Sequence, residues 1–487
     1  MNLQPLLEPG WVNAILPEII LSVGGMLLIL IDAFAPRAKQ ALAPVALMVF
    51  LAAAWSQNLF LRDGHFFGGT YEISAITVLF DITFLLAGIL ALLFSREYLQ
   101  REGIEDGAFY ALLAWGTVGM MMMSKGLDML IVVLGLEILS ICIFVLVGFH
   151  RRIPISNEAS LKYFLMGAFA TGFILYGIAF FYGATGSTNF VKMSLWFAQN
   201  DATPLLTVAF VLLMSGFGFK LALAPFHPWA PDVYQGAPTP VAGWLSVAPK
   251  AATLIALVRL FDAMSPILPK VNWMNMIAVL AVLSMIVGNA VAIVQRDLKR
   301  MLAYSGIAHV GYMMIAMLTV RDDSVAAVAV YTITYALMNI GAFGVVSLLV
   351  KNENDPHTLD DIAGLGFRRK FYGFALAMCM FSLAGLPPTA GFISKFYVFK
   401  TAIESGHTTV ALLGILASII SVYYYLRVVY YLYMKEPAEG TAVVASSGGV
   451  FAVGALMIAI VGILIIGIYP SPLFQAAGNA ARMMLQQ

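Results

Sequence analysis

The stretch that decides the fold class reads LLTVAFVLLMSGFGFKLALAPFHP over residues 205–228. It is long and apolar enough to form a membrane-spanning helix, which needs about 20 such residues. It also carries Lys220, and Pro225 follows a few residues later. A charge inside the bilayer costs at least roughly 2.5–3.5 kcal/mol on insertion scales, so such residues are rare and usually functional. The stretch therefore predicts a broken membrane helix with an ionisable group beside the break.

The composition of the whole chain points the same way. Of its 487 residues, 61% are hydrophobic and only 11% are charged, whereas soluble domains carry about 25% charged residues. The formal net charge of +1 provides no basic surface for nucleic acid. Two cysteines cannot hold an iron–sulfur cluster, and nothing near them has zinc-ligand spacing. We expect an integral membrane protein with no metal and no cofactor on this chain.

Runs of apolar residues predict an all-α polytopic membrane protein with about fourteen transmembrane helices. The first run is preceded by neither a basic region nor a cleavage motif, so we expect it to be a retained span. The expected spans are 14–33, 41–61, 73–95, 108–123, 127–149, 160–183, 205–225, 240–262, 273–294, 298–319, 325–350, 371–400, 409–434 and 447–469.

The distribution of Lys and Arg in the short loops predicts the orientation, because such residues concentrate on the cytoplasmic side. Fourteen follow odd-numbered spans: Arg37, Lys39, Arg96, Arg101, Arg151, Arg152, Arg296, Lys299, Arg300, Lys351, Arg368, Arg369, Lys370 and Lys435. Six lie on the other side: Arg62, Lys125, Lys192, Lys270, Arg321 and Arg482, with Lys400 left unassigned. We therefore expect a multi-pass protein with both termini outside the cytoplasm.

Four other spans carry an ionisable group deep inside. Glu137, Lys250 and His309 lie ten or eleven residues into their spans, which is about 15 Å at 1.5 Å per residue and half of a roughly 30 Å hydrocarbon core. Lys395 lies in the twelfth span, after Pro387 and Pro388. Together with Lys220, these residues predict a row of stations for protons or small cations.

Prolines interrupt the seventh and twelfth spans beside their lysines. A proline inside a helix frees a carbonyl, which at membrane depth must face protein or a water-filled cavity. Broken helices with adjacent ionisable groups are typical of ion-coupled transporters. The alternative is a plain proline kink beside a lysine that has a structural partner.

The two broken spans occupy matching positions if spans 4–8 and spans 9–13 form two five-helix units. An odd number of helices makes the second unit enter from the opposite face, so we expect two inverted repeats with broken helices 7 and 12. The expected organisation is 1–107 for the first three helices, 108–262 and 273–434 for the repeats, and 447–487 for the last helix and tail.

Glu137 is the only carboxylate at the centre of an expected span, and we interpret it as the counter-ion of Lys220, although sequence cannot show their contact. A carboxylate partner that approaches and leaves can load and release a lysine proton. His309 is equally consistent with a proton relay and with a structural residue. His227 and Lys299 are candidates for the proton entrance. We interpret Arg259, near Asp262, as an anchor at the membrane interface.

Known motifs for other chemistry are missing from the sequence. The Gly216-Phe-Gly218 segment has no third glycine at position 221 and follows no strand, so it is not a dinucleotide fingerprint. No phosphate-binding loop suggests that ATP drives the protein, and no arrangement of residues suggests a hydrolase. The sequence leaves an ion or proton translocator, or a membrane scaffold.

Three stretches of the chain resemble the antiporter-like membrane subunits of respiratory complex I, which are related to subunits of multi-subunit cation/proton antiporters. The stretches are LGLEILS at 134–140, GFGFKLALAPFHPWAPDVYQGAPTPV at 216–241 and SLAGLPPTAGFISKF at 382–396. The resemblance covers nearly the whole chain.

The resemblance implies a proton-translocating membrane subunit of the bacterial NADH:quinone oxidoreductase, and thus a subunit of a translocase with no redox chemistry of its own. By the resemblance, Glu137 matches the charged partner in span 5, and Lys220, Lys250 and Lys395 match the lysines of spans 7, 8 and 12. His309 matches the polar axis residue of span 10.

The resemblance also implies the location and the partners. It implies the bacterial inner membrane with periplasmic termini. The partners would be a neighbouring antiporter-like subunit, the small membrane subunits, the lipid bilayer and, through other subunits, the peripheral redox arm. FMN, iron–sulfur clusters, NADH and quinone would all bind to those other subunits. The alternative is a subunit of a multi-subunit cation/proton antiporter.

Overall fold

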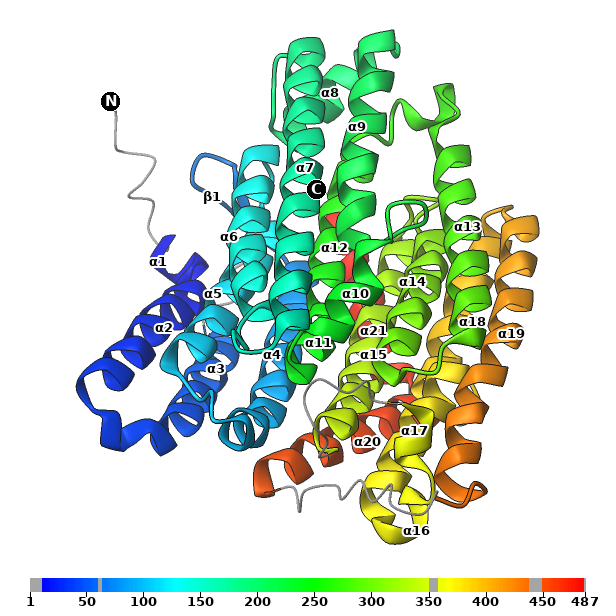
Figure 1. Cartoon of the computed structure of the whole chain (residues 1–487). Helices are drawn as coiled ribbons and strands as arrows, with labels where there is room; N and C mark the ends of the chain where they lie inside the picture. The colour runs from blue at the N-terminus through cyan, green and yellow to red at the C-terminus, as the bar shows by residue number, and fades with distance from the viewer. Residues whose placement is uncertain (1–10, 60–63, 350–357, 438–448, 486–487) are drawn as a thin grey trace.

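The computed structural model describes residues 11–59, 64–349, 358–437 and 449–485. These residues form a bundle of long helices with one short β-hairpin (Figure 1). Within them, twelve helical segments are long and apolar enough to cross a membrane. The expected class, an all-α polytopic membrane protein, is confirmed.

The helices follow one another with short connections. The first are α1 (Trp11–Ala14), α2 (Leu16–Phe34), α3 (Leu42–Leu59), α4 (Ala75–Glu102), α5 (Gly107–Lys125), α6 (Met129–Val147) and α7 (Pro154–Thr185). The middle ones are α8 (Phe190–Gln199), α9 (Pro204–Leu221), α10 (Trp229–Gly236), α11 (Thr239–Leu245), α12 (Ala248–Ala263) and α13 (Trp273–Val294). The last are α14 (Leu298–Ala316), α15 (Asp322–Ser347), α16 (Leu365–Arg368), α17 (Lys370–Ala384), α18 (Ala390–Glu404), α19 (Thr408–Tyr433), α20 (Val450–Ile468) and α21 (Ser471–Leu485). Short 3-10 turns lie at Pro36–Ala41, Leu268–Lys270 and Leu359–Ile362.

The expected number of fourteen spans is not confirmed. Within the described residues, two of the expected runs do not form a helix that is both long and apolar enough to cross a membrane. The run at 298–319 forms α14, whose first turn carries Lys299 and Arg300. The run at 371–400 is divided into α17 and α18, and each has 15 residues. Fifteen residues extend only about 22 Å, which is shorter than a roughly 30 Å hydrocarbon core.

Small polar side chains explain where several of these helices begin. Asp106, Asp128, Thr203 and Asp297 each precede a helix and accept a hydrogen bond from a backbone N–H of its first turn. Ser74 forms a capping box with Thr77 at the start of α4. Such caps satisfy N–H groups that have no partner inside the helix.

The hairpin pairs β1 (Gly64–Phe66) with β2 (Tyr71–Ile73) in antiparallel register, with His65 opposite Glu72. Glu72 accepts an ion-pair contact of 2.8 Å from Arg259 Nη1 of α12. Arg259 is only 2% exposed. Our interpretation of Arg259 as an interfacial anchor is therefore wrong, because its guanidinium turns inward to the hairpin carboxylate.

One basic residue in the orientation count also lies elsewhere than expected. Lys125, which we assigned to a loop, ends α5 and is 1% exposed. Its ammonium contacts two buried carboxylates instead of solvent. Arg62 and Lys351 lie outside the described residues, as does the side chain of Arg37.

The core of the bundle lies along α11, α12 and α15. The apolar windows of Thr239–Ala263 and of α15 are completely buried. Helix α15 packs against α4, α11, α17, α18, α20 and α21. In contrast, α7 exposes large apolar side chains, including Phe169 and Tyr176. Exposed apolar surface of this extent marks a lipid-facing or subunit-facing side.

Within the described residues, three helix breaks lie close to the three expected lysines. The first break, residues 222–228, separates α9 from α10, and the third break, residues 385–389, separates α17 from α18. Ala222 and Gly385 end the preceding helices with φ of 57° and 83°, in the left-handed region. The second break, residues 246–247, separates α11 from α12 inside what we expected to be one continuous span. Pro249, in the first turn of α12, marks it in the sequence.

Candidate functional site: a row of buried lysines beside helix breaks

Each of the three expected lysines is buried and adjoins one of the breaks. Lys220 is the penultimate residue of α9, Lys250 is the third residue of α12 and Lys395 lies in the second turn of α18. Their exposed fractions are 7%, 2% and 4%. Each lysine is therefore buried within two turns of a helix break.

The backbone groups released at the first break have partners from several helices. The Phe219 carbonyl accepts from the indole of Trp229 at 2.9 Å. The amide of Ala224 donates to Ser284 Oγ of α13 at 2.9 Å. Because α13 lies in the second expected repeat, this break is held in part by the other half of the bundle.

Lys220 contacts α6, but it does not contact Glu137 directly. Its Nζ donates to Ser140 Oγ at 2.7 Å. Ser140 lies three residues after Glu137, so the two side chains occupy neighbouring turns of α6. Glu137 accepts instead from Thr171 of α7 at 2.7 Å. The expected contact between Glu137 and Lys220 is absent from the described residues, because the serine hydroxyl takes the ammonium.

Lys250 and His309 approach each other across Gly306. Lys250 Nζ donates to the Gly306 carbonyl of α14 at 3.1 Å. A Cβ at Gly306 would lie 2.8 Å from the Tyr335 hydroxyl and 3.0 Å from Lys250 Nζ. The ring of Tyr335 lies 4.9 Å from the ring of His309, centroid to centroid. Only a residue without a side chain leaves room for this approach.

Two tyrosine hydroxyls hold the His309 ring. Nδ1 lies 2.8 Å from the hydroxyl of Tyr331 on α15, and Nε2 lies 3.0 Å from that of Tyr425 on α19. Sequence reasoning missed both partners. They lie 22 and 116 residues away in the chain. Their only signal was the richness of these spans in tyrosine.

Lys395 ends the row at the third break. Its Nζ donates to the carbonyls of Leu383 and Ala384, at 2.9 and 3.2 Å, and to Ser418 Oγ at 3.0 Å. The two carbonyls belong to the last turn of α17, where the negative end of the helix dipole favours a cation. The ammonium also lies 5.2 Å from the ring of Tyr312, which is 5.7 Å from the ring of His309.

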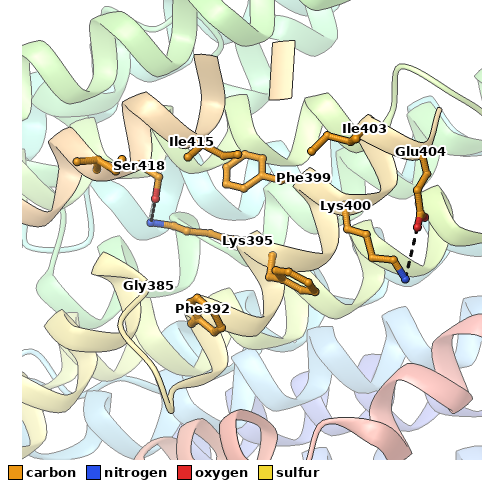
Figure 2. Close-up of a pocket in the computed structure, with 11 residues that line it drawn as sticks. Gly385, Phe392, Lys395, Phe399, Lys400, Ile403, Glu404, Ile415 and Ser418 are labelled. Carbon is orange, nitrogen blue, oxygen red and sulfur yellow. Dashed lines mark hydrogen bonds and ion pairs between the residues drawn. The ribbon is translucent and has the colours of Figure 1, made fainter. Parts of the chain in front are cut away.

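A cavity of about 470 Å³ lies beside Lys395 between α18 and α19 (Figure 2). Its residues are Gly385, Phe392, Lys395, Phe396, Phe399, Lys400, Ile403, Glu404, Ile415, Ser418 and Ile419. Phe396, Ile403 and Ile419 are 58%, 43% and 63% exposed, so the cavity opens on the outer face of the bundle. Figure 2 shows the Lys395 side chain directed toward Ser418, away from the Lys400–Glu404 pair.

The two entrance candidates are not brought together. His227 lies in the first break with its ring 6.4 Å from that of Tyr304. Lys299 is buried and donates to the Ala237 carbonyl, at the far end of α10, at 2.9 Å. The eight residues of α10 separate these sites by about 12 Å.

A polar hollow of about 170 Å³ lies next to α10. It is lined by Ile155, Glu158, Ala159, Lys162, Asp232 and Gln235. Arg300 of α14 pairs with Asp232 at 2.7 Å and donates to Gln235 at 2.9 Å. The hollow therefore provides a charged surface between α7 and α10, which sequence reasoning missed.

The arrangement gives two groups of stations. Within the described residues, no hydrogen bond or ion pair joins Lys220 to Lys250. Lys250, His309 and Lys395 are linked by the rings of Tyr335 and Tyr312. In the same part of the chain, no three His, Cys, Asp or Glu residues are placed to hold a metal ion. Cys142 and Cys379 are both free thiols and both buried.

Comparison with known proteins decides the family. The family model for "NADH:quinone oxidoreductase/Mrp antiporter, TM" matches residues 126–421. NADH-quinone oxidoreductase subunit N of Trichlorobacter lovleyi is 41% identical, covering 99% of this chain and 100% of that relative. The chain belongs to this family. Another member, subunit N 1 of Solibacter usitatus, is 38% identical, and the alignment covers 99% of each chain. The resemblance inferred from the three sequence stretches is confirmed.

Solved structures of the family agree. A chain of respiratory complex I from Thermus thermophilus is 33% identical, with a TM-score of 0.81 over 96% of this chain and 99% of that one. A chain of the Mrp complex from a Dietzia species has a TM-score of 0.83 over 98% of each chain. Its identity is only 17%, so this second likeness shows the fold alone.

Proposed function

We propose that the chain is a proton-translocating membrane subunit of an NADH:quinone oxidoreductase. Electron transfer from NADH to quinone, through FMN and iron–sulfur clusters in other subunits, would drive proton movement through this one. The observation that carries the proposal is the row of three buried lysines, each beside a helix break. The relatives named as subunit N support the assignment to the oxidoreductase over the cation/proton antiporter alternative.

Protons would move by transfer between the stations of the row. Lys220, Lys250 and Lys395 donate only to neutral oxygens among the described residues. A carboxylate partner would hold the proton on a lysine, whereas a neutral oxygen accepts from either charge state. The tyrosines around His309 offer hydroxyls that both accept and donate. We therefore assign the relay to Lys220, Lys250, His309 and Lys395.

Glu137 would control the first station. The present arrangement, with Ser140 between the two groups, corresponds to the open state of a Glu137–Lys220 pair. Closing the pair would hold the proton on Lys220, and opening it would favour release toward Lys250. When two opposite charges that are about 4 Å apart separate by a further few ångströms, their interaction energy weakens by about 2 kcal/mol at an effective dielectric constant of ~20.

The way the helices pack in the two expected five-helix units also supports the inverted repeat. Residues 108–262 contain α5 to α12, and residues 273–434 contain α13 to α19. In each unit the first helix packs on the second, as α5 on α6 and α13 on α14. The third packs on the broken helix, as α7 on α9 and α15 on α17 and α18. Residues 1–107 and 447–487 would flank the repeats.

We place the chain in the bacterial inner membrane with both termini in the periplasm. The excess of Lys and Arg in the loops after odd-numbered spans supports this orientation, also without Lys125. The polar hollow beside α10 would then face the cytoplasm and, with His227 and Lys299, supply protons to the row. Alkaline phosphatase fused to the C-terminus should be active, and an inactive fusion with an active cytoplasmic reporter would reverse the assignment.

The decisive experiment compares Glu137→Gln with Glu137→Asp in the assembled complex. Glutamine removes the charge that controls Lys220, so both quinone reduction and proton pumping should fall, because coupled steps stall together. Aspartate keeps the charge and should retain much of both. Glu436→Gln is the matched control, since the Glu436 side chain is exposed and lies outside the row and the hollow.

Co-purification separates the oxidoreductase from the antiporter alternative. The tagged chain should bring down the iron–sulfur subunits of the peripheral arm. Normal coupled turnover of assembled complex carrying Glu137→Gln, and likewise Lys220→Ala, would refute the pair mechanism. Recovery of the chain with antiporter subunits and without iron would refute the assignment to the oxidoreductase.

A further inference from the structure

A second cluster of buried charges lies away from the lysine row, where α2 and α4 begin and α5 ends. Lys125 Nζ lies 2.6 Å from Glu18 Oε1 and 2.8 Å from Asp81 Oδ2. The exposed fractions of the Lys125, Glu18 and Asp81 side chains are 1%, 8% and 0%. Two carboxyl groups thus share one ammonium inside the protein.

Neutral donors complete the surroundings of the two carboxyl groups. The Tyr71 hydroxyl donates to Glu18 Oε1 at 2.6 Å. Gln57 Nε2 and Ser124 Oγ donate to Asp81 at 2.9 Å each. These contacts come from β2, α3 and α5, and none of the three residues supplies a second cation.

The other charged groups nearby are already paired. Arg259 binds Glu72 at 2.8 Å and reaches the cluster only through the Ser124 carbonyl, which accepts from its Nε at 2.7 Å. Asp262 and His65 lie beyond this pair and act on Arg259 and Glu72. The Arg259–Glu72 pair is balanced, and so it does not neutralise the cluster.

The cluster itself has an unbalanced charge. With both carboxyl groups ionised and Lys125 protonated, Glu18, Asp81 and Lys125 carry one net negative charge. Isolated buried charge is strongly unfavourable, and such groups bind a proton instead. Glu18 Oε2 is buried and has no hydrogen-bond partner within the described residues. The geometry therefore leaves an oxygen free for a proton beside a charge that a proton would cancel.

We propose that Glu18, Asp81 and Lys125 form a proton-binding site, separate from the lysine row, that holds one exchangeable proton on its two carboxyl groups. The proton belongs to the pair of carboxyl groups, because both contact the same ammonium. The inference does not depend on the proposed function. A cluster that served only to tie α2, α4 and α5 together would keep both carboxyl groups ionised at neutral pH.

Infrared difference spectroscopy on the purified complex tests the proposal. A spectrum recorded near neutral pH minus one recorded at alkaline pH should contain the C=O stretching band of a protonated carboxyl group. Asp81→Asn or Glu18→Gln leaves one carboxylate with one ammonium, so either change should remove one carboxyl equivalent from the band. Glu158→Gln, a change at a carboxyl group that is 63% exposed, should leave the band intact.

Two variants keep the test decisive if one of them does not assemble, since Asp81→Asn and Glu18→Gln act on different helices. Carbon-13 labelling of glutamate or aspartate in the unchanged complex assigns the band without any substitution. A wild-type spectrum in which neither label shifts a band between neutral and alkaline pH would overturn the proposal. So would a band in both Asp81→Asn and Glu18→Gln that is as large as the band of the wild-type complex. Quinone reductase activity of the same samples reports separately on the proposed function.

Discussion

The first and third breaks carry similar lysines in different surroundings. Lys220 precedes its break, and its hydrogen-bond partner among the described residues is the hydroxyl of Ser140 on another helix. Lys395 follows its break and is held by two carbonyls of α17 as well as by Ser418. The Ser140 hydroxyl donates to the Leu136 carbonyl at 2.6 Å, and the neighbouring carboxylate of Glu137 offers Lys220 a second partner, whereas Lys395 is held by three oxygens. We infer that the Lys220 ammonium changes partners during pumping, whereas the Lys395 ammonium keeps the same hydrogen-bond partners.

The largest effect should come from removing either lysine. Lys220→Ala and Lys395→Ala should each lower proton pumping by about 100-fold or more, the range for losing a positioned proton carrier. Arginine keeps the charge but hardly deprotonates, so Lys220→Arg and Lys395→Arg should only partly substitute. Pumping by reconstituted complex in vesicles provides the measurement.

Lys400→Ala is the matched control for Lys395. Lys400 lies on the same helix, with a side chain that is 51% exposed and paired with Glu404. It should pump normally. If Lys220→Arg pumped at the full rate, Lys220 would be an electrostatic element and the difference between the two breaks would have another meaning.

Substituting the two serines tests the comparison directly. Ser140→Ala leaves the Lys220 ammonium without a hydrogen-bond partner in the described part of the chain. Leaving this buried donor unpaired should destabilise the charged lysine by about 1–3 kcal/mol. Ser418→Ala leaves the two carbonyls on Lys395 and should cost about 0.5–1.5 kcal/mol. The Ser140→Ala variant should therefore pump several-fold more slowly than the Ser418→Ala variant. Equal rates would show that the carbonyls do not distinguish the two sites.

A methyl group at Gly306 should disturb the connection between the two breaks. Its Cβ would lie 3.0 Å from Lys250 Nζ and 2.8 Å from the Tyr335 hydroxyl, so one of them must move. We expect Gly306→Ala to lower pumping by a few-fold while the complex still assembles. Gly454→Ala on α20 is the control, since nothing lies within 4 Å of a Cβ there. If the Gly306→Ala variant pumped at the full rate with Lys250 displaced, Lys250 would not be part of the proton path.

The smallest effect concerns the Arg259–Glu72 ion pair. Both of its members stay charged at neutral pH, whereas the lysines of the row are proposed to gain and lose protons. Burial raises the pKa of Glu72, but the charge and hydrogen bond of Arg259 outweigh it and hold the pKa below its ordinary value of 4.5. The pair therefore stabilises the fold at pH values above 4.5, and this stabilisation is lost as the pH falls through the lowered pKa. Thermal unfolding of the complex should show a loss in acid that Glu72→Gln reduces. An identical acid profile in the variant would exclude the pair as its source.

Sequence reasoning predicted the features that depend on single residues. A lysine, a glutamate or a proline inside an apolar run is conspicuous, so the row of stations and two of the three breaks were visible. The second break, at residues 246–247, was not visible, because no glycine accompanies Pro249 and the apolar run continues on both sides. A proline in the first turn of a helix is compatible with that helix, so it gave an ambiguous signal.

The features that sequence reasoning missed depend on contacts between distant parts of the chain. Tyr425 meets His309 from 116 residues away, and Lys125 meets Glu18 from 107 residues away. Glu18 and Asp81 lay inside the expected spans 14–33 and 73–95, and Lys125 was assigned to a loop, so nothing in the sequence connected the three residues. Lys220 donates to Ser140, 80 residues away in the chain, and not to Glu137, and no sequence pattern encodes this choice of partner.

The complete burial of α11, α12 and α15 has a consequence for biosynthesis. Asn339 of α15 donates to Ser246 Oγ at the second break, at 2.6 Å. Because Asn339 comes 93 residues after Ser246, the break enters the membrane before its partner has been made. At a synthesis rate of ~5–20 residues per second the interval is roughly 5–20 s. During that time the faces of α11 and α12 that later pack on α15 must contact lipid or an insertion factor, with Ser246 uncovered. The young chain therefore depends on membrane insertion factors most while residues 264–339 emerge from the ribosome.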